Sequence, residues 1–558
     1  MATPYDPPPV LLTGTGLTVG ELIALADGEA VPAVAPEARE RAVRSWRAAQ
    51  RLAAEGRLYG RGTGVGAHRS VTVDEGDETA HGLRLLRSHA GGAGALLPAR
   101  QVRAMLAVRA NQLLAGGSGI QPAFVDALTE ALRLGVHPAV NEYGGIGTGD
   151  LTALAQTGLT LIGERPWVNA DPPRPPDAGT AHTAPPGPPD GDLFDSAGTA
   201  WRVPDRPVPD AGMVGWPNTS WRDPGPGPDL DPAPDTVRTA PAEPGTLPAP
   251  VTLQPGDALA LLSSNALALG QAALAQHGLD VLLRATHAVA ALSLAAVGGS
   301  AEGYAAAVHA LRPYEGAARA AREVRRLLGI GADGAPGRRI QDPFGFRAFP
   351  QVHGCALDAS ERLRTIVEVE VNCPSENPLV AADGTTAHHH GGFFAAPLGL
   401  ALDAADLALL QTAQLSVARL AALGDPDLTG LPGFLATGPA SSSGMMILEY
   451  TANSALAELR SCAAPASAGH AVLSHGLEEA ASFAGQAARQ TLRAAEAYGT
   501  VLACELVTAV RALRLRPVPP PVPAFTVATA VLPLGTDDRP LTPDIAAAAE
   551  LLPRLAEL

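Results

Sequence analysis

The chain has 558 residues and a formal net charge of −16, and 46% of its residues are hydrophobic while only 4% are aromatic. A chain of this length buries a large core, and its acidic balance argues against nucleic acid or an anionic membrane surface as a partner. We find no basic-then-apolar N-terminal segment and no apolar run of membrane-spanning length, and the 4 cysteines lack CxxC spacing. We therefore expect a cytoplasmic protein that binds no nucleic acid and enters no membrane.

Four blocks follow one another along the chain. Residues 1–165 mix glycine-rich loop signals with helical stretches, of which residues 98–115 place apolar side chains at helical spacing. Residues 166–252 are crowded with Pro, Gly and Asp, which predicts an irregular insertion because so little apolar burial cannot offset the entropy of ordering. We assign residues 253–516 to a long-helix bundle with active-site loops, and residues 517–558 to a C-terminal tail with a short helix.

The bundle is predicted from long stretches rich in Ala and Leu, which favour helix over strand. These stretches cover residues 259–297, 396–423, 442–463 and 478–514, and Pro517 with the prolines after it ends the last one. Several helices of this length, without a fixed-period repeat, predict a mainly α fold built on a central bundle.

Short motifs between the helices carry the candidate chemistry. Tyr59 opens a glycine-rich loop, His89 follows a Leu-Leu-Arg-Ser run, and Thr148 stands between two glycines. Later motifs are Gln341-Asp342-Pro343-Phe344-Gly345-Phe346-Arg347, Glu370-Val371-Asn372, Asn377-Pro378-Leu379 and Pro465-Ala466-Ser467. In this order the motifs resemble the aromatic amino acid lyase family, which includes the histidine and phenylalanine ammonia-lyases. The resemblance implies the mostly α-helical lyase fold with its central long-helix bundle.

The chain departs from the family pattern where the chemistry takes place. In that family an Ala-Ser-Gly triplet cyclises and loses water to form a methylidene-imidazolone (MIO), a carbon electrophile. The corresponding run here, residues 144–151, is shorter by one residue and offers Gly147-Thr148-Gly149 with no serine. A ring derived from Thr148 would be an ethylidene whose added methyl shields the electrophilic carbon. We therefore expect no resident cofactor.

The resemblance also implies a set of residues around the substrate. The polar residues that persist at family positions are Tyr59, His89, Gln341, Arg347 and Glu478. The substituted positions are Ser263 in place of an asparagine, Phe344 in place of a second tyrosine, and Phe394 within a segment that reads Gly-Asn-Phe-His-Gly in the family. These substitutions point away from ordinary deamination of histidine or phenylalanine.

Tyr59 is the implied catalytic base, the alternative being a tyrosine packed at the start of its loop. A free tyrosine has a pKa of about 10, so a base acting near neutrality needs a lowered pKa, which backbone N–H groups of a glycine-rich loop can provide. Arg347 offers a planar fork for a substrate carboxylate, or else forms an ion pair with Glu370 or Asp342.

Other polar residues also have two interpretations each. His89 is either a substrate contact or a satisfied core histidine, and Glu478 is either a site residue or a solvated helix charge. His388-His389-His390 do not predict a metal site, because adjacent side chains in an extended segment point in alternate directions. We expect no metal.

Three functions are consistent with these residues. The first is a lyase-type enzyme of specialised metabolism that keeps the base Tyr59 and the carboxylate anchor Arg347 but lacks the usual electrophile. Its substrate is an amino-acid-derived carboxylate with an acidified proton or a better leaving group than ammonium. The second is an ammonia-lyase or aminomutase with a Thr148-derived ring, and the third is a catalytically silent homologue that binds or scaffolds a partner. The resemblance further implies a homotetramer whose sites combine residues of more than one subunit.

Overall fold

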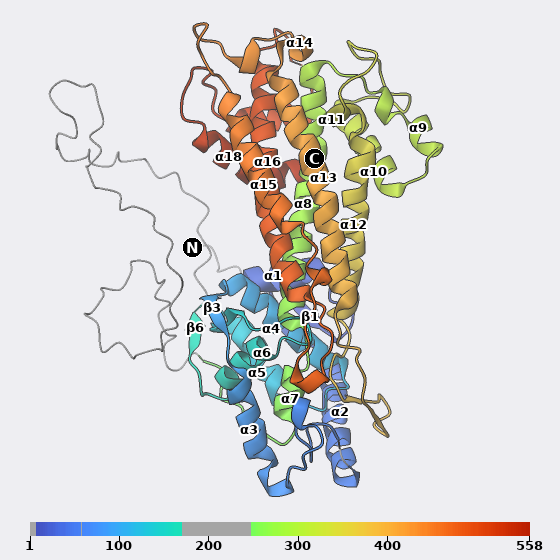
Figure 1. Ribbon diagram of the computed structural model, residues 1–558, viewed down its shortest axis with the longest axis vertical. Coiled ribbons are helices and arrows are strands. Elements are labelled where there is room, and N and C mark those ends of the chain that lie inside the picture. The colour runs from blue at the N-terminus through green and yellow to red at the C-terminus, as the bar shows by residue number, and fades with distance from the viewer. Residues whose placement is uncertain (1–6, 57, 170–246, 520) are drawn as a thin grey trace, which may run out of the picture. The chain divides into compact units, whose positions relative to one another are not determined.

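The computed structural model describes residues 7–56, 58–169, 247–519 and 521–558, which belong to one compact unit. Most of the predicted insertion at residues 166–252 lies outside the described residues. Long helices run beside one another over much of the unit, and most elements of the first part of the chain gather at one end of them (Figure 1). The prediction of a mainly α fold with a central long-helix bundle is confirmed.

The first part of the chain forms helices of up to 20 residues and three small two-stranded sheets. Its elements are β1 (Pro9–Leu12), α1 (Val19–Asp27), β2 (Val31–Val34), α2 (Pro36–Glu55), α3 (Glu78–His89), β3 (Ala93–Leu96), α4 (Ala99–Ala115), α5 (Ala123–Leu134), β4 (Val136–Pro138), β5 (Asn141–Tyr143), α6 (Leu151–Leu161) and β6 (Trp167–Asn169). Strand β1 pairs with β2 in parallel, whereas β3–β5 and β4–β6 are antiparallel. Helix α4 joins this part to the bundle because it packs on both α1 and α8.

The second part supplies the bundle. Its elements are α7 (Asp257–Leu262), α8 (Ala266–Val297), α9 (Ala306–Ala310), α10 (Glu315–Leu328), α11 (Phe344–Arg347), α12 (Phe349–Glu370), β7 (Leu379–Val380), β8 (Ala387–His388), α13 (Ala396–Gly424), α14 (Pro426–Thr429), α15 (Met446–Cys462), α16 (Ala484–Arg514), α17 (Pro523–Val531) and α18 (Thr542–Ala556). Helix α8 is the centre of the bundle, where α4, α10, α12, α16 and α18 all pack against it. Small alanine side chains let these helices approach closely, and left-handed Gly298 ends α8.

Most of the predicted helices match the structure, and two boundaries differ for a physical reason. The stretch predicted over residues 259–297 is broken at Ser263–Asn265, where the backbone turns to let the Ser264 carbonyl accept a hydrogen bond from Asp150 N–H. The helix predicted from residue 478 begins only at Ala484, because residues 473–478 fold back as a loop toward the candidate site. Both deviations therefore occur beside that site.

The expectation that no apolar run reaches membrane-spanning length is wrong for two segments of the described chain. By length and composition alone, Asp257–Val297 and Ala396–Gly424 are long and apolar enough to cross a membrane. In the first segment 89% of the most apolar window is buried inside the protein, and in the second 44% is buried. Their hydropathy reflects the Ala and Leu residues with which α8 and α13 pack against their neighbours.

Candidate active site

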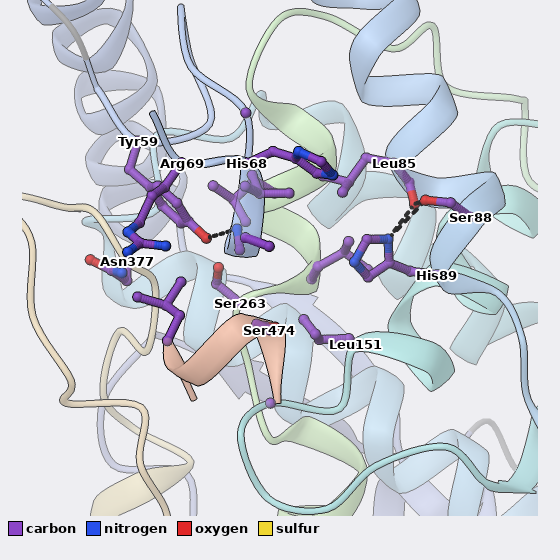
Figure 2. A pocket seen from close by; sticks show the side chains of 18 of the residues that line it. Tyr59, His68, Arg69, Leu85, Ser88, His89, Leu151, Ser263, Asn377 and Ser474 are labelled. Atoms are coloured by element: carbon purple, nitrogen blue, oxygen red, sulfur yellow. Dashed lines mark hydrogen bonds between the residues drawn. The ribbon is translucent and has the colours of Figure 1, made fainter. Parts of the chain in front are cut away.

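A cavity of about 1200 Å³ opens where the loops of the first part meet α7 and the start of α8. Figure 2 shows its side chains, which come from segments far apart in the sequence. The contributing segments are the Tyr59 loop through residue 74, helix α3, residues 144–152, the α7–α8 break, residues 377–393 and residues 473–478. Its wall combines apolar side chains with several titratable ones, as is typical of small-molecule sites.

Six of the residues implied by the resemblance line this cavity. They are Tyr59, His89, Thr148, Gly149, Ser263 and Glu478. Tyr59 and His89 face the cavity from opposite sides in Figure 2. Gly147 lies just behind the wall and is buried.

Three others lie far from the cavity within one chain. Gln341, Phe344 and Arg347 are in or just before α11, near the C-terminal end of α8, whereas the cavity borders its N-terminal end (Figure 1). Helix α8 has 32 residues, which separates its ends by about 48 Å at a rise of about 1.5 Å per residue. The expectation that these three residues line the site is therefore not met within a single chain.

Arg347 is also not held by the ion pairs considered from the sequence. Its Nε donates to the backbone carbonyl of Asp342, and its guanidinium carbon lies 4.1 Å from the centre of the Phe344 ring. The Asp342 carboxylate pairs instead with Arg339 at 2.8 Å. Within the described residues Arg347 forms no ion pair, so its charge is uncompensated.

Phe394 is absent from the cavity wall, where its neighbour Phe393 takes its place. The Phe393 carbonyl accepts a hydrogen bond of 2.5 Å from Asn265 Nδ2, which fixes this loop against the start of α8. Phe393, which coincides with the phenylalanine of the family segment, therefore lines the cavity, whereas the substituted position Phe394 does not.

Tyr59 has the backbone contact expected of its loop but not the expected pKa. Its phenolic oxygen accepts a hydrogen bond of 2.7 Å from Gly66 N–H. Burial raises the pKa of Tyr59 and is the largest effect, the Gly66 N–H lowers it, Glu478 raises it and Arg69 lowers it. The net pKa is raised, so the expectation of a lowered pKa is wrong, and the phenol is neutral near pH 7.

His89 is oriented by its own helix. Its Nδ1 lies 2.9 Å from the Leu85 carbonyl and 3.0 Å from Ser88 Oγ. Because a carbonyl can only accept, Nδ1 carries a proton, and in the neutral tautomer Nε2 keeps its lone pair. In that tautomer His89, at the end of α3, offers a hydrogen-bond acceptor at the cavity wall.

The loop that carries Thr148 is fixed by the N-terminus of α16. Ser482 Oγ donates to the Gly147 carbonyl at 3.0 Å, and Phe483 N–H donates to the Ile146 carbonyl at 2.9 Å. Gly147 has φ +88°, and a Cβ placed there would lie 2.1 Å from Ser482 Oγ. The position next to Thr148 therefore tolerates only glycine while Ser482 is present.

Asp150 attaches the other end of this loop to α8. Its carboxylate accepts a hydrogen bond of 2.9 Å from Ala268 N–H, in the first turn of that helix. Burial nevertheless raises the pKa of Asp150 to about 6, against the lowering effect of hydrogen bonds from Ala268 and Leu267. The loop is thus held at both ends by helix N-termini, and Thr148 lies half-buried at the cavity between them.

The residues present do not fit the usual MIO group. That group takes its exocyclic carbon from a serine, and Thr148 adds a methyl to this carbon. The alanine that precedes the serine has no room for its methyl at Gly147. The loop geometry is therefore built for Gly-Thr-Gly and not for the family triplet.

Several cavity residues were not identified from the sequence. Arg69 lies beside Tyr59 in Figure 2 and forms no ion pair with any described residue. Its place in the same loop, ten positions after Tyr59, was the available signal. His389 Nε2 accepts from Tyr59 N–H at 3.3 Å, whereas His390 Nε2 faces the Glu376 carbonyl at 2.9 Å, so these adjacent histidines diverge. No group of three or more His, Cys, Asp or Glu in the described part of the chain is arranged to hold a metal ion.

Sequence comparison extends the resemblance over nearly the whole chain. The profile of the aromatic amino acid lyase family matches residues 17–182 and 237–531. The histidine ammonia-lyase of Anaeromyxobacter sp. (strain K) is 34% identical over 562 residues, which cover 97% of this chain and 98% of the relative. The histidine ammonia-lyase of Symbiobacterium thermophilum is 32% identical over 548 residues, which cover 97% of this chain and 96% of the relative.

Solved structures of the same fold include enzymes with different reactions. Ergothionase from Treponema denticola, an ergothioneine-degrading enzyme, superposes with a TM-score of 0.80 at 23% identity, over 99% of this chain and 100% of its own. Tyrosine aminomutase from Streptomyces globisporus gives 0.79 at 24% identity, over 98% of this chain and 97% of its own. At this identity the likeness shows the fold alone. The family profile and the whole-chain identity to histidine ammonia-lyases show that this chain belongs to the aromatic amino acid lyase family of ammonia-lyases and aminomutases, and that it is an ammonia-lyase-like enzyme.

Proposed function

We propose that this enzyme catalyses a lyase-type elimination on an amino-acid-derived carboxylate of specialised metabolism, without the usual MIO group. The observation that carries the proposal is the Thr148 loop. Members of the family normally form MIO from Ala-Ser-Gly, whereas here Thr148 lines the cavity and the space beside Gly147 is filled by Ser482 Oγ. Neither the serine nor the alanine of the triplet is present, and the alanine has no room.

Tyr59 is the proposed base. In the elimination, the substrate C–H bond gives its proton to the phenolate, its electron pair forms the new C=C bond, and the leaving group departs with the electrons of its own bond to carbon. Because burial raises the pKa of Tyr59, the phenolate is scarce near pH 7. A cationic substrate group beside the phenol favours the phenolate, in the same direction as the nearby Arg69.

The substrate class follows from what the cavity lacks. No side chain of this cavity turns ammonium into a better leaving group, so the substrate itself must bring an acidified proton or a better leaving group. Arg69 provides an unpaired cation for a carboxylate, and Glu478 provides an anion for a cationic group. These two charges favour a zwitterionic or betaine-like substrate over one without charged groups.

We also propose that the active enzyme is a homotetramer. Arg347 is uncompensated and lies about 48 Å along α8 from the cavity of its own chain. An arginine from a neighbouring subunit then reaches the cavity as a second carboxylate ligand. This arrangement supports the role expected for Arg347 without requiring it to act in its own chain.

A second candidate is an ammonia-lyase or aminomutase that uses a ring formed from Thr148. The whole-chain relatives favour it, because those named above are histidine ammonia-lyases at 34% and 32% identity. In this version Gly149 N attacks the Gly147 carbonyl carbon and two water molecules are lost. The Gly147 carbonyl already accepts a hydrogen bond from Ser482 Oγ, which would polarise it toward such an attack.

Intact-mass measurement of the purified protein separates the two candidates. We expect the unmodified mass, and a mass lower by two waters would favour the ring. The same protein is then assayed with histidine, phenylalanine and tyrosine, and with their N-trimethyl betaines as substrates with a better leaving group. We expect acrylate formation from a betaine and not from a plain amino acid. Conversion of plain histidine at an ordinary enzymatic rate by protein of unmodified mass would overturn the proposal.

A further inference from the structure

A buried arginine of α4 holds the end of α7, next to the break between α7 and α8 at the candidate active site. Arg109 is 1% exposed, and its guanidinium donates to the backbone carbonyls of Ala260 and of Leu261, the latter at 3.2 Å. These carbonyls lie in the last residues of α7, where a helix leaves carbonyl groups without partners of its own. Arg109 therefore fixes the chain immediately before Ser263, which lines the cavity.

The same guanidinium also reaches Ser263 through an ion pair. Arg109 Nη1 lies 2.8 Å from Glu376 Oε1, and both side chains are buried. The other carboxylate oxygen, Glu376 Oε2, accepts a hydrogen bond of 3.0 Å from Ser375 N–H. Ser375 Oγ in turn donates to the Ser263 carbonyl at 2.9 Å. The backbone of Ser263 is thus held from α7 on one side and from residues 375–376 on the other.

A third set of contacts connects Arg109 with the Thr148 loop. Gln112 Oε1 accepts from Arg109 Nη1 at 3.4 Å and from Ser264 Oγ at 2.7 Å. The Ser264 carbonyl accepts a hydrogen bond of 2.7 Å from Asp150 N–H, at the end of the Thr148 loop. Gln112 and Ser264 are both fully buried, so water does not compete for these bonds. The position of the Thr148 loop therefore depends on side chains of α4 that do not line the cavity.

We propose that Arg109 is a positioning residue, which holds the break between α7 and α8, and through it the Thr148 loop, in place at the cavity. The inference rests on the proposed function only in taking this cavity as the place where the substrate reacts. A guanidinium presents its donors in one planar fork, so it bonds two backbone carbonyls, a carboxylate and an amide at once. A lysine ammonium gathers its donors on one atom and cannot span the same partners. Apolar side chains would avoid the desolvation of a buried ion pair, so the contribution of the pair here is order at the break.

Hydrogen–deuterium exchange of the full chain, measured by mass spectrometry, tests this role without any substrate. Arg109→Lys keeps a positive charge beside Glu376 but loses the fork. We expect exchange to become at least about threefold faster in the peptides that cover residues 144–152 and 259–266, because the hydrogen bonds of the break open more often.

Arg103→Lys is the matched control. Arg103 is also a buried arginine of α4, and its guanidinium donates at 2.9 Å to the carbonyls of Leu25 and Ala26, at the end of α1. None of these three residues lines the candidate active site. Arg103→Lys should therefore leave exchange of the two peptides unchanged, although it removes a comparable set of buried hydrogen bonds.

Kinetics separate a positioning role from a merely structural one, with whichever compound the amino acid and betaine assays show to be converted. Arg69 and Glu478, the charges proposed to bind the substrate, lie on other segments, so KM of Arg109→Lys should change by less than about twofold. Its kcat should fall by about tenfold or more, because small displacements of the groups around a reacting centre slow the reaction strongly. Arg103→Lys should keep both constants.

Ser375→Ala repeats both measurements with a milder change, and it decides the test if Arg109→Lys does not fold. It removes only the hydroxyl that holds the Ser263 carbonyl and leaves the ion pair in place. We expect the same pattern with a smaller effect.

Unchanged exchange of residues 144–152 and 259–266 in the folded variant overturns the positioning role, and so does equally fast exchange in Arg103→Lys. A variant that alters KM while kcat stays at the wild-type value overturns it as well. If the wild type converts none of the tested compounds while exchange responds as expected, the proposed elimination fails and the assignment of Arg109 to the Thr148 loop stands.

Discussion

Among single residues, Tyr59 carries the proposed proton transfer, and Tyr59→Phe removes only the phenolic oxygen that Gly66 N–H contacts. We expect kcat/KM to fall by about 100- to 10,000-fold, the usual contribution of a positioned base. The kinetic measurement uses as substrate whichever compound is converted in the amino acid and betaine assays described above. Because burial raises the pKa of Tyr59, wild-type kcat/KM should rise with pH through the neutral and mildly alkaline range, as the phenolate fraction grows.

Tyr314→Phe is the matched control for this experiment. Tyr314 is 65% exposed and lies outside the cavity, so its hydroxyl should not affect kcat/KM. Unchanged activity in Tyr59→Phe, or a wild-type rate that does not vary with pH, would show that another group removes the proton.

Substitution of Gly147 tests whether the Thr148 loop has room for a side chain at this position. At φ +88°, an added Cβ would lie 2.1 Å from Ser482 Oγ and 2.8 Å from Phe483 N. We expect Gly147→Ala to lower the free energy of unfolding by about 1–3 kcal/mol, because both the backbone conformation and the contact are strained. Ser482→Ala in the same chain removes the closest atom and should restore part of this loss. Denaturant unfolding of the single and double variants measures the coupling.

Gly20→Ala is the control for Gly147→Ala. Gly20 lies in α1, and a Cβ added there meets nothing within 4 Å. We expect it to stabilise the fold by up to about 1 kcal/mol, as alanine does in a helix. If Gly147→Ala is equally well tolerated, Ser482 does not exclude the alanine of the family triplet.

The sequence located some site residues and not others for physical reasons. Tyr59, His89 and Thr148 lie in short motifs, and the segments that carry them meet at one cavity within a single chain. For these residues the motifs were therefore enough to indicate a place at the cavity. Arg69 belongs to no such motif, and its importance comes from lying unpaired next to Tyr59. The rise in the pKa of Tyr59 depends on burial by distant segments, which a local sequence pattern does not contain.

Among the elements, helix interiors were predictable and helix ends at the site were not. Residues 396–423 and 98–115 matched α13 and α4 closely, because their Ala and Leu content favours helix along their whole length. The stretch at 259–297 has the same composition, yet it breaks where Asp150 binds the Ser264 carbonyl and the first turn of α8. Tertiary contacts to the Thr148 loop override local propensity at this point.

Helix α13 contains a buried carboxyl group that links stability to pH. Burial raises the pKa of Asp406 to about 8, against the lowering effect of Thr491, and neighbouring Asp403 raises it further. Asp406 Oδ2 accepts from Thr491 Oγ1 at 3.0 Å, and Oδ1 has no hydrogen-bond partner among the described residues. The unfolded carboxyl titrates near pH 3.9, so between about pH 4 and pH 8 the folded state holds a proton that the unfolded state has lost. The free energy of unfolding therefore falls as pH rises through this window.

Asp406→Asn should remove this dependence, because the amide is neutral at every pH and can still contact Thr491. Relative to the wild type, we expect the variant to gain about 1–3 kcal/mol of stability between pH 5 and pH 8. Urea unfolding at both pH values measures the gain. Asp333→Asn, an exposed control on a loop, should show no such change. A constant difference between Asp406→Asn and wild type would mean that Asp406 is ionised throughout.

In the whole molecule, α7 and the start of α8 border the cavity at one end of the bundle, and α11, which contains Arg347, lies near the other end. Figure 1 shows α7 and α11 at these opposite ends. The order of motifs along a sequence does not show whether a residue lines the cavity of its own chain or the cavity of a neighbouring subunit. The distance of about 48 Å along the 32 residues of α8 makes that distinction. Symmetric packing of identical chains is the simplest way to bring Arg347 to a cavity.

This arrangement predicts complementation between two inactive variants, Tyr59→Phe and Arg347→Ala. When the two are co-expressed in equal amounts, each site takes Tyr59 from one chain and Arg347 from another. About a quarter of the sites then contain both wild-type residues, so about a quarter of wild-type activity should return. Tyr59→Phe with His89→Ala is the matched control, since both residues line one chain's cavity and no mixing restores the pair. If the first mixture is no more active than the average of its two parents, Arg347 does not act across subunits, and Arg69 remains as the cation on the cavity wall for the substrate carboxylate.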